Sequence, residues 1–298
     1  MEKQIAYYKK AGRISQKVRS YIYEIVKPGV PILELARKIH NKIEELGAIS
    51  AFPVNLSMND IAAHNHPSID NNEAAGGLLK VDYGISIDGY IADSAISIDL
   101  TPDNKHNDII EATEHALNKA LDLLKENPTI HQIGATIQKT IESKGFSPVV
   151  NLSGHSIDRY KVHAGITIPN YGNNNENKLP AGVYAIEPFA TTGEGKVYNG
   201  QPGNIYEIIN LKKTRSPKAR EILDYVYEKY KTMPFSLREV QEKFGPMAKL
   251  ALLELENQNI IKSHSQLVEK SHKPVTQVEH TFIKTENGEI IVTTRPVI

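Results

Sequence analysis

The chain contains no cysteine among its 298 residues, so it forms no disulfide bond, thiolate zinc site or cysteine nucleophile. Neither sign of charge dominates: 35 lysines and arginines balance 35 aspartates and glutamates, and no overall field favours DNA, RNA or an anionic membrane. No apolar run reaches the roughly 18–20 residues that span a bilayer. The first ten residues are polar and charged and hold no signal-peptide core. We expect a soluble, cytoplasmic protein of one large domain or two modest ones.

The strongest local signal is the pair Asp88-Gly89 between two β-type runs. A type I′ turn requires positive φ at both central positions, and Asp-Gly is well suited to it, so the sequence predicts a hairpin. A two-residue turn puts Gly84 opposite Asp93. Asp82 and Asp93 then become diagonal neighbours on one face of the hairpin, about 7–8 Å apart at their Cα atoms.

Two carboxylates that close repel each other, and both stay ionised only when a cation lies between them. The alternative is a pair of solvated carboxylates on an exposed strand face, which is the usual place for charged residues. The small neighbours Gly84, Ser86 and Ala95 leave room for a ligand beside Asp82 and Asp93. The hairpin alone therefore leaves both a metal site and an exposed face open.

Helices and strands alternate along the rest of the chain, which predicts an α+β fold. Helical periodicity predicts helices at about 4–26, 31–47, 106–126 and 130–144. Short apolar runs predict strands at about 148–152, 182–189, 275–282 and 290–293, and a short strand or loop at 51–57.

A different pattern occupies residues 213–272. Three helices, at 219–231, 236–244 and 247–257, precede a short strand at 260–261, which suggests a winged-helix-like subdomain inserted between two core strands. Nucleic-acid binding is one interpretation, but lysines and glutamates are mixed throughout the segment. A binding face would cluster positive charge, so we favour a structural role.

Acidic residues and one histidine recur in or beside the short apolar strands, where an uncompensated charge would be costly. Together they suggest a common centre: Asp82, Asp93, His155, Glu187 and Glu279. Four carboxylates and one imidazole suit two divalent ions that share bridging carboxylates. The mixed oxygen and nitrogen donors favour Mn, Fe, Co or Zn over Ca.

The same five residues, in this order, resemble the metal ligands of the pita-bread metallopeptidases, and further motifs narrow the likeness. These motifs are Ala51-Phe52-Pro53, Ala62-Ala63-His64, Ser153-Gly154-His155-Ser156-Ile157 with Tyr160 and His163, Ala185-Ile186-Glu187-Pro188-Phe189-Ala190-Thr191, and Gln277-Val278-Glu279-His280-Thr281. They resemble the type II methionine aminopeptidases, and the likeness covers essentially the whole chain. The insertion before the last glutamate is a type II feature, and the short segment before the hairpin is similar to the archaeal members.

The resemblance implies a fold and a set of residue roles. The fold would be the pita-bread (creatinase/aminopeptidase) fold, antiparallel sheets covered by helices, over residues 1–195 and 273–298, with the subdomain at 213–272 inserted. The metal ligands would be Asp82 (bidentate), Asp93 (bridging), His155, Glu187 and Glu279. Glu187 would also carry protons, His64 and His163 would line the substrate side, and Phe52 would belong to an apolar pocket for the methionine side chain.

The resemblance also implies an activity. The enzyme would use two divalent metal ions (Co, Mn, Fe or Zn) and the hydroxide that they activate to remove the initiator methionine from nascent polypeptides with a small second residue. Its partners would be nascent chains that begin with methionine and, as a candidate, the ribosome; we expect a monomer. Two alternatives stay open: an Xaa-Pro peptidase of the same fold, and a non-enzymatic binding protein. Only 81 residues precede Asp82, too few for the large domain that precedes it in prolidases.

His64 is followed by Asn65-His66-Pro67, where relatives usually carry an aromatic residue, so the entrance of the pocket is expected to differ. The remaining histidines are expected on helices, polar loops or an outward strand face, without a role in the site: His40, His106, His115, His131, His264, His272 and His280.

Overall fold

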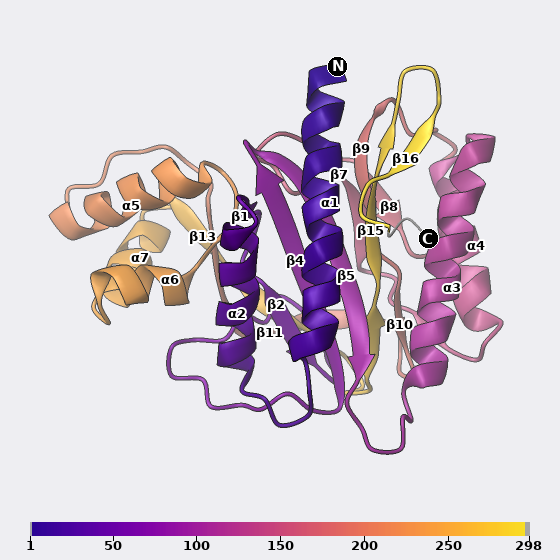
Figure 1. The fold of residues 1–298 in the computed structure, drawn as a ribbon, viewed down its shortest axis with the longest axis horizontal. Helices are drawn as coiled ribbons and strands as arrows, with labels where there is room; N and C mark the ends of the chain where they lie inside the picture. Colours follow the sequence, from indigo (N-terminus) through magenta and orange to yellow (C-terminus); the bar gives the residue numbers. More distant parts are fainter. Residues whose placement is uncertain (1, 296–298) are drawn as a thin grey trace.

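A nine-stranded antiparallel sheet forms the centre of the fold (Figure 1). The structure is a computed structural model, and it describes residues 2–295. Its strands run in the spatial order β1 (Ile49–Ser50), β4 (Leu78–Ile87), β5 (Tyr90–Asp99), β15 (Glu279–Lys284), β9 (Gly182–Ile186), β7 (Ser153–Ile157) and β8 (Thr167–Pro169), with β2 (Asn55–Met58) paired to β4 and β16 (Ile290–Val292) paired to β15. The α+β class expected from the sequence, with antiparallel sheets covered by helices, is confirmed by this sheet and its helical cover.

The hairpin of β4 and β5 has the predicted register. Ile87 pairs with Tyr90 and Gly84 with Asp93. Asp88 and Gly89 have φ angles of 52° and 83°, as a turn with two positive φ values requires. Asp82 and Asp93 therefore share a face, as the alternation of side chains along a strand predicts.

Four helices cover one face of the sheet in two pairs (Figure 1). The first pair is α1 (Glu2–Ile25) and α2 (Ile32–Glu45), and the second is α3 (Asn107–Leu123), extended by the 3₁₀ turn η1 (Leu124–Glu126), and α4 (Ile130–Glu142). Ile22 of α1 and Ile39 of α2 are fully buried against the hairpin, in one cluster with Tyr83. Ile137 of α4 packs with Phe282 of β15 in a second cluster.

This cover decides which strand residues reach the other face of the sheet. Val81, Tyr83 and Ile85 belong to the cluster beneath α1 and α2. Because successive side chains of a strand alternate, Asp82 and Gly84 point away from the helices. The carboxylates thus lie on the face that the four helices leave open.

Some strand predictions were wrong in their bounds. The strand expected at 148–152 is only β6 (Ser147–Pro148), and His155 lies within β7 rather than after a strand. Each of the two predicted strands at 182–189 and 275–282 is divided into two. The first gives β9 and β10 (Phe189–Thr191), and the second gives β14 (Val275–Gln277) and β15. β14, β10 and β6 form a separate three-stranded sheet. The division after β9 leaves Glu187 and Pro188 between strands, since proline cannot donate to a ladder.

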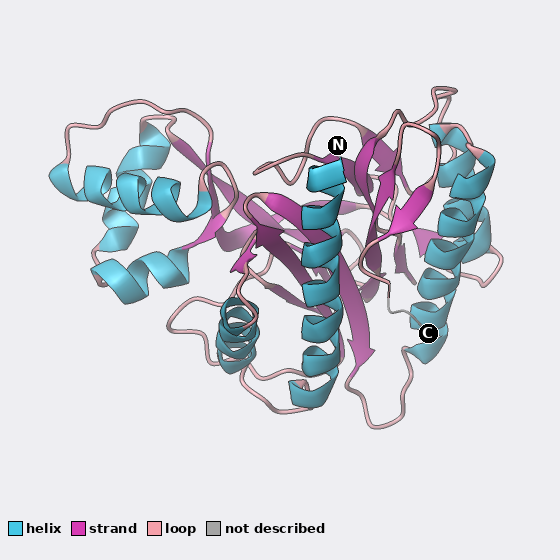
Figure 2. Ribbon diagram, turned by 45° about the horizontal axis from the view of Figure 1, so that its top comes forward, coloured by secondary structure: helices cyan, strands magenta, loops and turns pink. Residues whose placement is uncertain are grey.

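Residues 213–272 contain α5 (Pro217–Tyr230), α6 (Leu237–Phe244) and α7 (Ala248–Asn257), which lie to one side of the main sheet (Figure 2). A four-stranded sheet joins them to the body in the order β12 (Phe235–Ser236), β11 (Val197–Ile208), β13 (Ile261–Glu269) and β3 (Ile61–Ala63). The sequence missed β11, and the short strand predicted at 260–261 is the start of the longer β13. The winged-helix-like character of the segment stays a prediction.

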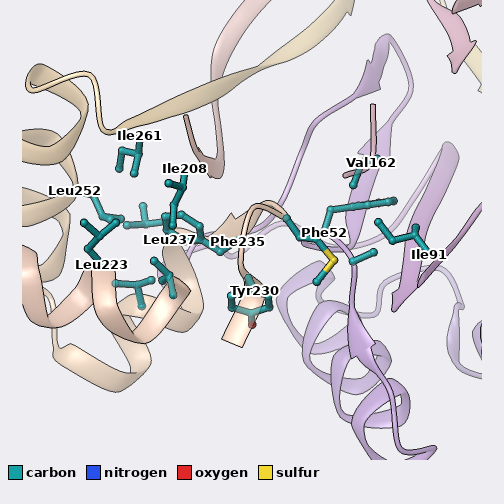
Figure 3. Close-up of a cluster of buried hydrophobic side chains, with 14 of the residues drawn as sticks. Phe52, Ile91, Val162, Ile208, Leu223, Tyr230, Phe235, Leu237, Leu252 and Ile261 are labelled. Carbon is teal, nitrogen blue, oxygen red and sulfur yellow. The ribbon is translucent and has the colours of Figure 1, made fainter. Parts of the chain in front are cut away.

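A shared apolar cluster joins this segment to the body. Leu223, Leu237 and Leu252 meet between the three helices, and Tyr230 lies between them and the loop residues Phe52 and Val162 of the body (Figure 3). Within residues 2–295, no helix is both long enough and apolar enough to cross a membrane.

Candidate active site

Five neighbouring strands, β4, β5, β15, β9 and β7, bring the predicted metal ligands to one place. Glu279 at the start of β15 pairs with Ala95, two residues from Asp93 on the same face of β5. His155 of β7 pairs with Ala185 of β9, the strand that precedes Glu187. Asp82, Asp93, Glu279 and His155 thus lie on separate strands of one sheet, and Glu187 directly follows the end of another.

Distances within the group are those of a shared site. Donor atoms of Asp93, His155 and Glu279 all lie within 4.8 Å of one another. The Nε2 atom of His155 is 3.7 Å from Asp93 Oδ2 and 3.6 Å from Glu187 Oε1. Gln277 Nε2 donates to Glu187 Oε2 at 3.2 Å and to Asp82 Oδ2 at 3.4 Å. This amide therefore links the carboxylates of Asp82 and Glu187.

The carboxylates carry a strong electrostatic penalty. Burial raises the pKa of Asp82 to about 7. Burial, and then the charge of Asp82, raises the pKa of Asp93 well above its usual value. The pKa values of Glu187 and Glu279 are raised in the same way, by burial and by neighbouring carboxylates. Like charges this close stay ionised together when a cation neutralises them.

Two further observations fit a bound cation. Asp82 Oδ1 and Asp93 Oδ1 are buried and have no hydrogen-bond partner within residues 2–295. Buried polar atoms without partners are rare, and each requires an explanation such as a bound ion. Burial lowers the pKa of His155 to about 3, so its imidazole is neutral and free to ligate. The residues present therefore fit one or more divalent cations with oxygen and nitrogen ligands.

Beside the carboxylates lies a cavity of ≈ 60 Å³. Asp82, Asp93, His155 and Glu279 line one side. The other side carries apolar and polar side chains: Phe52, Asn55, His64, Val162, His163, Ile205, Pro234 and His264. Glycine at position 84 allows the Phe52 ring to pack directly against β4, because a Cβ there would lie 2.5 Å from that ring.

The structure places all three predicted substrate-side residues, Phe52, His64 and His163, at this cavity. The His163 ring centroid is 4.2 Å from that of His155. Burial lowers the pKa of His64 to about 4, so its ring is neutral near pH 7. Uncharged imidazoles can both donate and accept hydrogen bonds, which suits them to a peptide group.

Sequence reasoning missed several members of the site. His264, expected on a loop or helix without a role, lies on β13, with Nε2 3.3 Å from Glu207 Oε2 and its ring 5.4 Å from that of His64. Hydrogen bonds from His264 and Lys262 hold the pKa of Glu207 at about 2 against the effect of burial. The sequence gives only a weak indication of the strand that carries His264, because residues 262–266 of β13 are polar and show no apolar alternation. Asn55 could have been found only from its pairing with Asp82.

Comparisons with known proteins agree with this geometry. The model of metallopeptidase family M24 matches residues 6–225. The methionine aminopeptidase of Pyrococcus abyssi is 44% identical over 289 residues, which cover 95% of this chain and 97% of that protein. The chain belongs to the methionine aminopeptidases of metallopeptidase family M24.

Solved structures show the same fold at lower sequence identity. The structure of a thermophilic Arx1 aligns with a TM-score of 0.84 at 20% identity and covers 98% of this chain and 91% of that one. A methionine aminopeptidase from Rickettsia prowazekii aligns with a TM-score of 0.69 at 21% identity, covering 99% and 98%. These likenesses confirm the pita-bread fold expected from the sequence.

Proposed function

We propose that this enzyme removes the N-terminal methionine from nascent proteins and peptides whose second residue is small. The observation that carries the proposal is the convergence of Asp93, His155 and Glu279 within 4.8 Å, beside an apolar-walled cavity, in a chain of the methionine aminopeptidase family. Nascent polypeptides that begin with methionine are then its substrates. The ribosome is a candidate partner, and we expect a cytoplasmic monomer.

We assign the metal ligands to the five residues that meet on the sheet: Asp82, Asp93, His155, Glu187 and Glu279. Four carboxylates and one imidazole would hold two divalent ions, and these donors suit Mn, Fe, Co or Zn. Such ions, when bound, polarise the scissile carbonyl and lower the pKa of water.

The remaining chemistry belongs to the side chains around the ions. Glu187 would take a proton from the attacking water and pass it to the leaving amine, the usual work of a carboxylate general base. His64 and His163 face the same cavity, where their N–H groups can stabilise the oxygen of the tetrahedral intermediate. Phe52, Val162 and Ile205 give the cavity an apolar wall suited to a flexible thioether side chain.

The experiment that tests the proposal measures methionine released from a Met-Ala-Ser peptide. The protein is stripped with a chelator and reloaded separately with Mn, Fe, Co or Zn, with an Ala-Pro peptide assayed in parallel. We expect metal-dependent release of methionine and no cleavage of Ala-Pro. Asp93→Asn should abolish release, whereas the matched change Asp103→Asn, on an exposed loop, should not.

The other results would each support a different function. Cleavage of Ala-Pro alone would identify an Xaa-Pro peptidase. Absence of cleavage by every reloaded form, with metal shown to be bound, would favour a binding protein. Native mass measurement and cosedimentation with ribosomes would test the monomer and the ribosome partner separately.

A further inference from the structure

The backbone of His64 has an unfavourable conformation for a residue other than glycine. Its φ angle is 60°, in the left-handed region that non-glycine residues seldom adopt. It lies just after β3, at the start of the loop 64–67. A residue held in such a conformation needs support from its surroundings. The support here comes from the next two residues, Asn65 and His66.

Asn65 fixes one side of the loop. Its side-chain Nδ2 donates to Leu56 O at 2.7 Å, and its own carbonyl accepts from Leu56 N at 2.7 Å. Gln266 of β13 donates to Asn65 Oδ1 at 2.8 Å. The loop is therefore tied to β2 on one side and to β13 on the other.

His66 fixes the other side and is 1% exposed. Its backbone N–H donates to Gly203 O at 3.1 Å, and its carbonyl accepts from Asn204 Nδ2 at 2.9 Å. The approach is close, because a Cβ at Gly203 would lie 2.1 Å from His64 O. Backbone contacts thus hold His64 and His66 against β11.

The His66 ring links the body to α6. Nε2 lies 3.3 Å from Arg238 Nε, and Nδ1 lies 2.8 Å from Val54 O. A guanidinium donates and never accepts, so Nε2 is the acceptor and Nδ1–H donates to Val54 O. Burial, and then the charge of Arg238, lowers the pKa of His66 to about 3, which keeps the ring in this neutral form.

Arg238 is itself held in one position. It is 3% exposed and pairs with Glu242 at 2.9 Å, one turn further along α6. Glu242 also pairs with Arg37 of α2 at 2.9 Å, but Arg37 is about half exposed. Arg238 therefore joins α6 to the loop of His64, whereas Arg37 joins α6 only to the outer surface of α2.

We propose that Arg238 and His66 are positioning residues for His64: through this buried contact, α6 fixes the loop from which His64 reaches the substrate cavity. The inference rests on the proposed function, in which His64 hydrogen-bonds the scissile peptide. Neither residue lines the cavity, so neither is expected to touch substrate. The segment that carries α6 thereby affects catalysis without supplying Arg238 to the reaction.

Arg238→Met in the metal-loaded, full-length enzyme tests the proposal first. We expect kcat/KM for Met-Ala-Ser to fall about 10–100-fold, mainly through kcat, because a small misplacement of a catalytic group can cost about 10²-fold. Arg37→Met is the matched control, since it also removes an arginine from Glu242 but leaves His66 alone; it should stay within about twofold. If Arg238→Met does not fold, His66→Leu takes its place, and His66→Gln, which keeps an acceptor for Arg238, should recover most of the lost activity.

A double-mutant cycle separates positioning from a general structural effect. In a His64→Ala background, Arg238→Met should lower kcat/KM by less than about twofold, because the group that it positions is gone. An equal loss in both backgrounds would overturn the proposal, as would an Arg238→Met enzyme with wild-type kcat. So would a His64→Ala enzyme with wild-type kcat, because the loop would then carry nothing to position.

Histidine-labelled NMR provides a measurement that does not require activity. The ring signal that disappears in His64→Ala identifies His64. That signal should shift in Arg238→Met and stay in place in Arg37→Met. An unmoved signal in Arg238→Met would contradict the positioning role. If the His64 signal shifts in Arg238→Met but the unaltered enzyme releases no methionine, the effect of Arg238 on His64 stands and the proposed function is refuted instead.

Discussion

At the scale of single residues, Glu187 differs from the other three carboxylates of the site. It follows the end of β9 and precedes Pro188, outside any strand. Its Oε1 faces His155 at 3.6 Å and its Oε2 accepts from Gln277 at 3.2 Å. This position fits the two roles that we propose for Glu187, metal ligand and proton carrier.

We expect Glu187→Gln to lower kcat for methionine release by at least about 10²-fold, because an amide cannot accept the proton of the attacking water. Glu194→Gln is the control, since Glu194 is exposed and its carboxylate pairs at the surface with Lys270. Kinetics and metal content are measured on the same samples. A Glu187→Gln enzyme with bound metal and unchanged kcat would contradict the proton-transfer role.

The residues that sequence reasoning could find were those in apolar surroundings. Asp82 and Asp93 stand out because Asp88-Gly89 sets the register and the neighbouring positions are apolar or small. His264 did not stand out, because a polar strand carries it and its partner Glu207 is 57 positions away. Gln277 belongs to one of the sequence motifs, yet its bridge between Asp82 and Glu187 depends on the separation of β14 from β15, which no local pattern encodes.

At the scale of elements, the tip of the hairpin depends on Gly89. Its φ is 83°, and a Cβ there would lie 2.6 Å from the Tyr160 ring. Tyr160 N–H also donates to Gly89 O at 2.8 Å, so the ring has little freedom to withdraw. The turn is thus fixed by conformation and by packing together.

Gly89→Ala should therefore destabilise the fold more than a change at a glycine with strain alone. Gly29 is the matched control, since its φ is 85° and a Cβ there would meet nothing within 4 Å. We expect Gly29→Ala to cost about 1–2 kcal/mol of unfolding free energy, and Gly89→Ala about 1–3 kcal/mol more from the clash. Urea unfolding of both variants measures the difference, and equal losses would show that Tyr160 yields without cost.

Among the elements, helices and the hairpin were predictable, and the long strands β11 and β13 were not. The helix cores Ile22, Ile39 and Ile137 recur at helical spacing and are fully buried. β11 and β13 pair with each other across the segment that holds α5 to α7, so they gain their partners only in the folded chain. Their polar faces give no alternation, and tertiary pairing decides their conformation.

At the scale of the whole molecule, the four carboxylates link metal binding to stability and pH. An unfolded aspartate titrates near pH 4, whereas burial raises the pKa of folded Asp82 to about 7. Between these values the metal-free folded chain binds more protons than the unfolded chain, so its free energy of unfolding falls as pH rises. The pKa values of Asp93, Glu187 and Glu279 are raised too and add to the same trend.

A bound divalent cation should remove this penalty, because it stabilises the ionised carboxylates. We expect the gain in Tm on metal loading to be small at pH 5.5 and to reach about 5 °C or more at pH 8. Buried neutral histidines act in the opposite direction: the lowered pKa values of His64, His66 and His155 reduce stability as pH falls below about 6.5. The informative quantity is therefore the difference in Tm between loaded and stripped protein at each pH, with Asp93→Asn as the variant in which it should vanish. A gain that is largest at pH 5.5 would show that protonated carboxylates do not oppose the ions, and the assigned ligands would then be wrong.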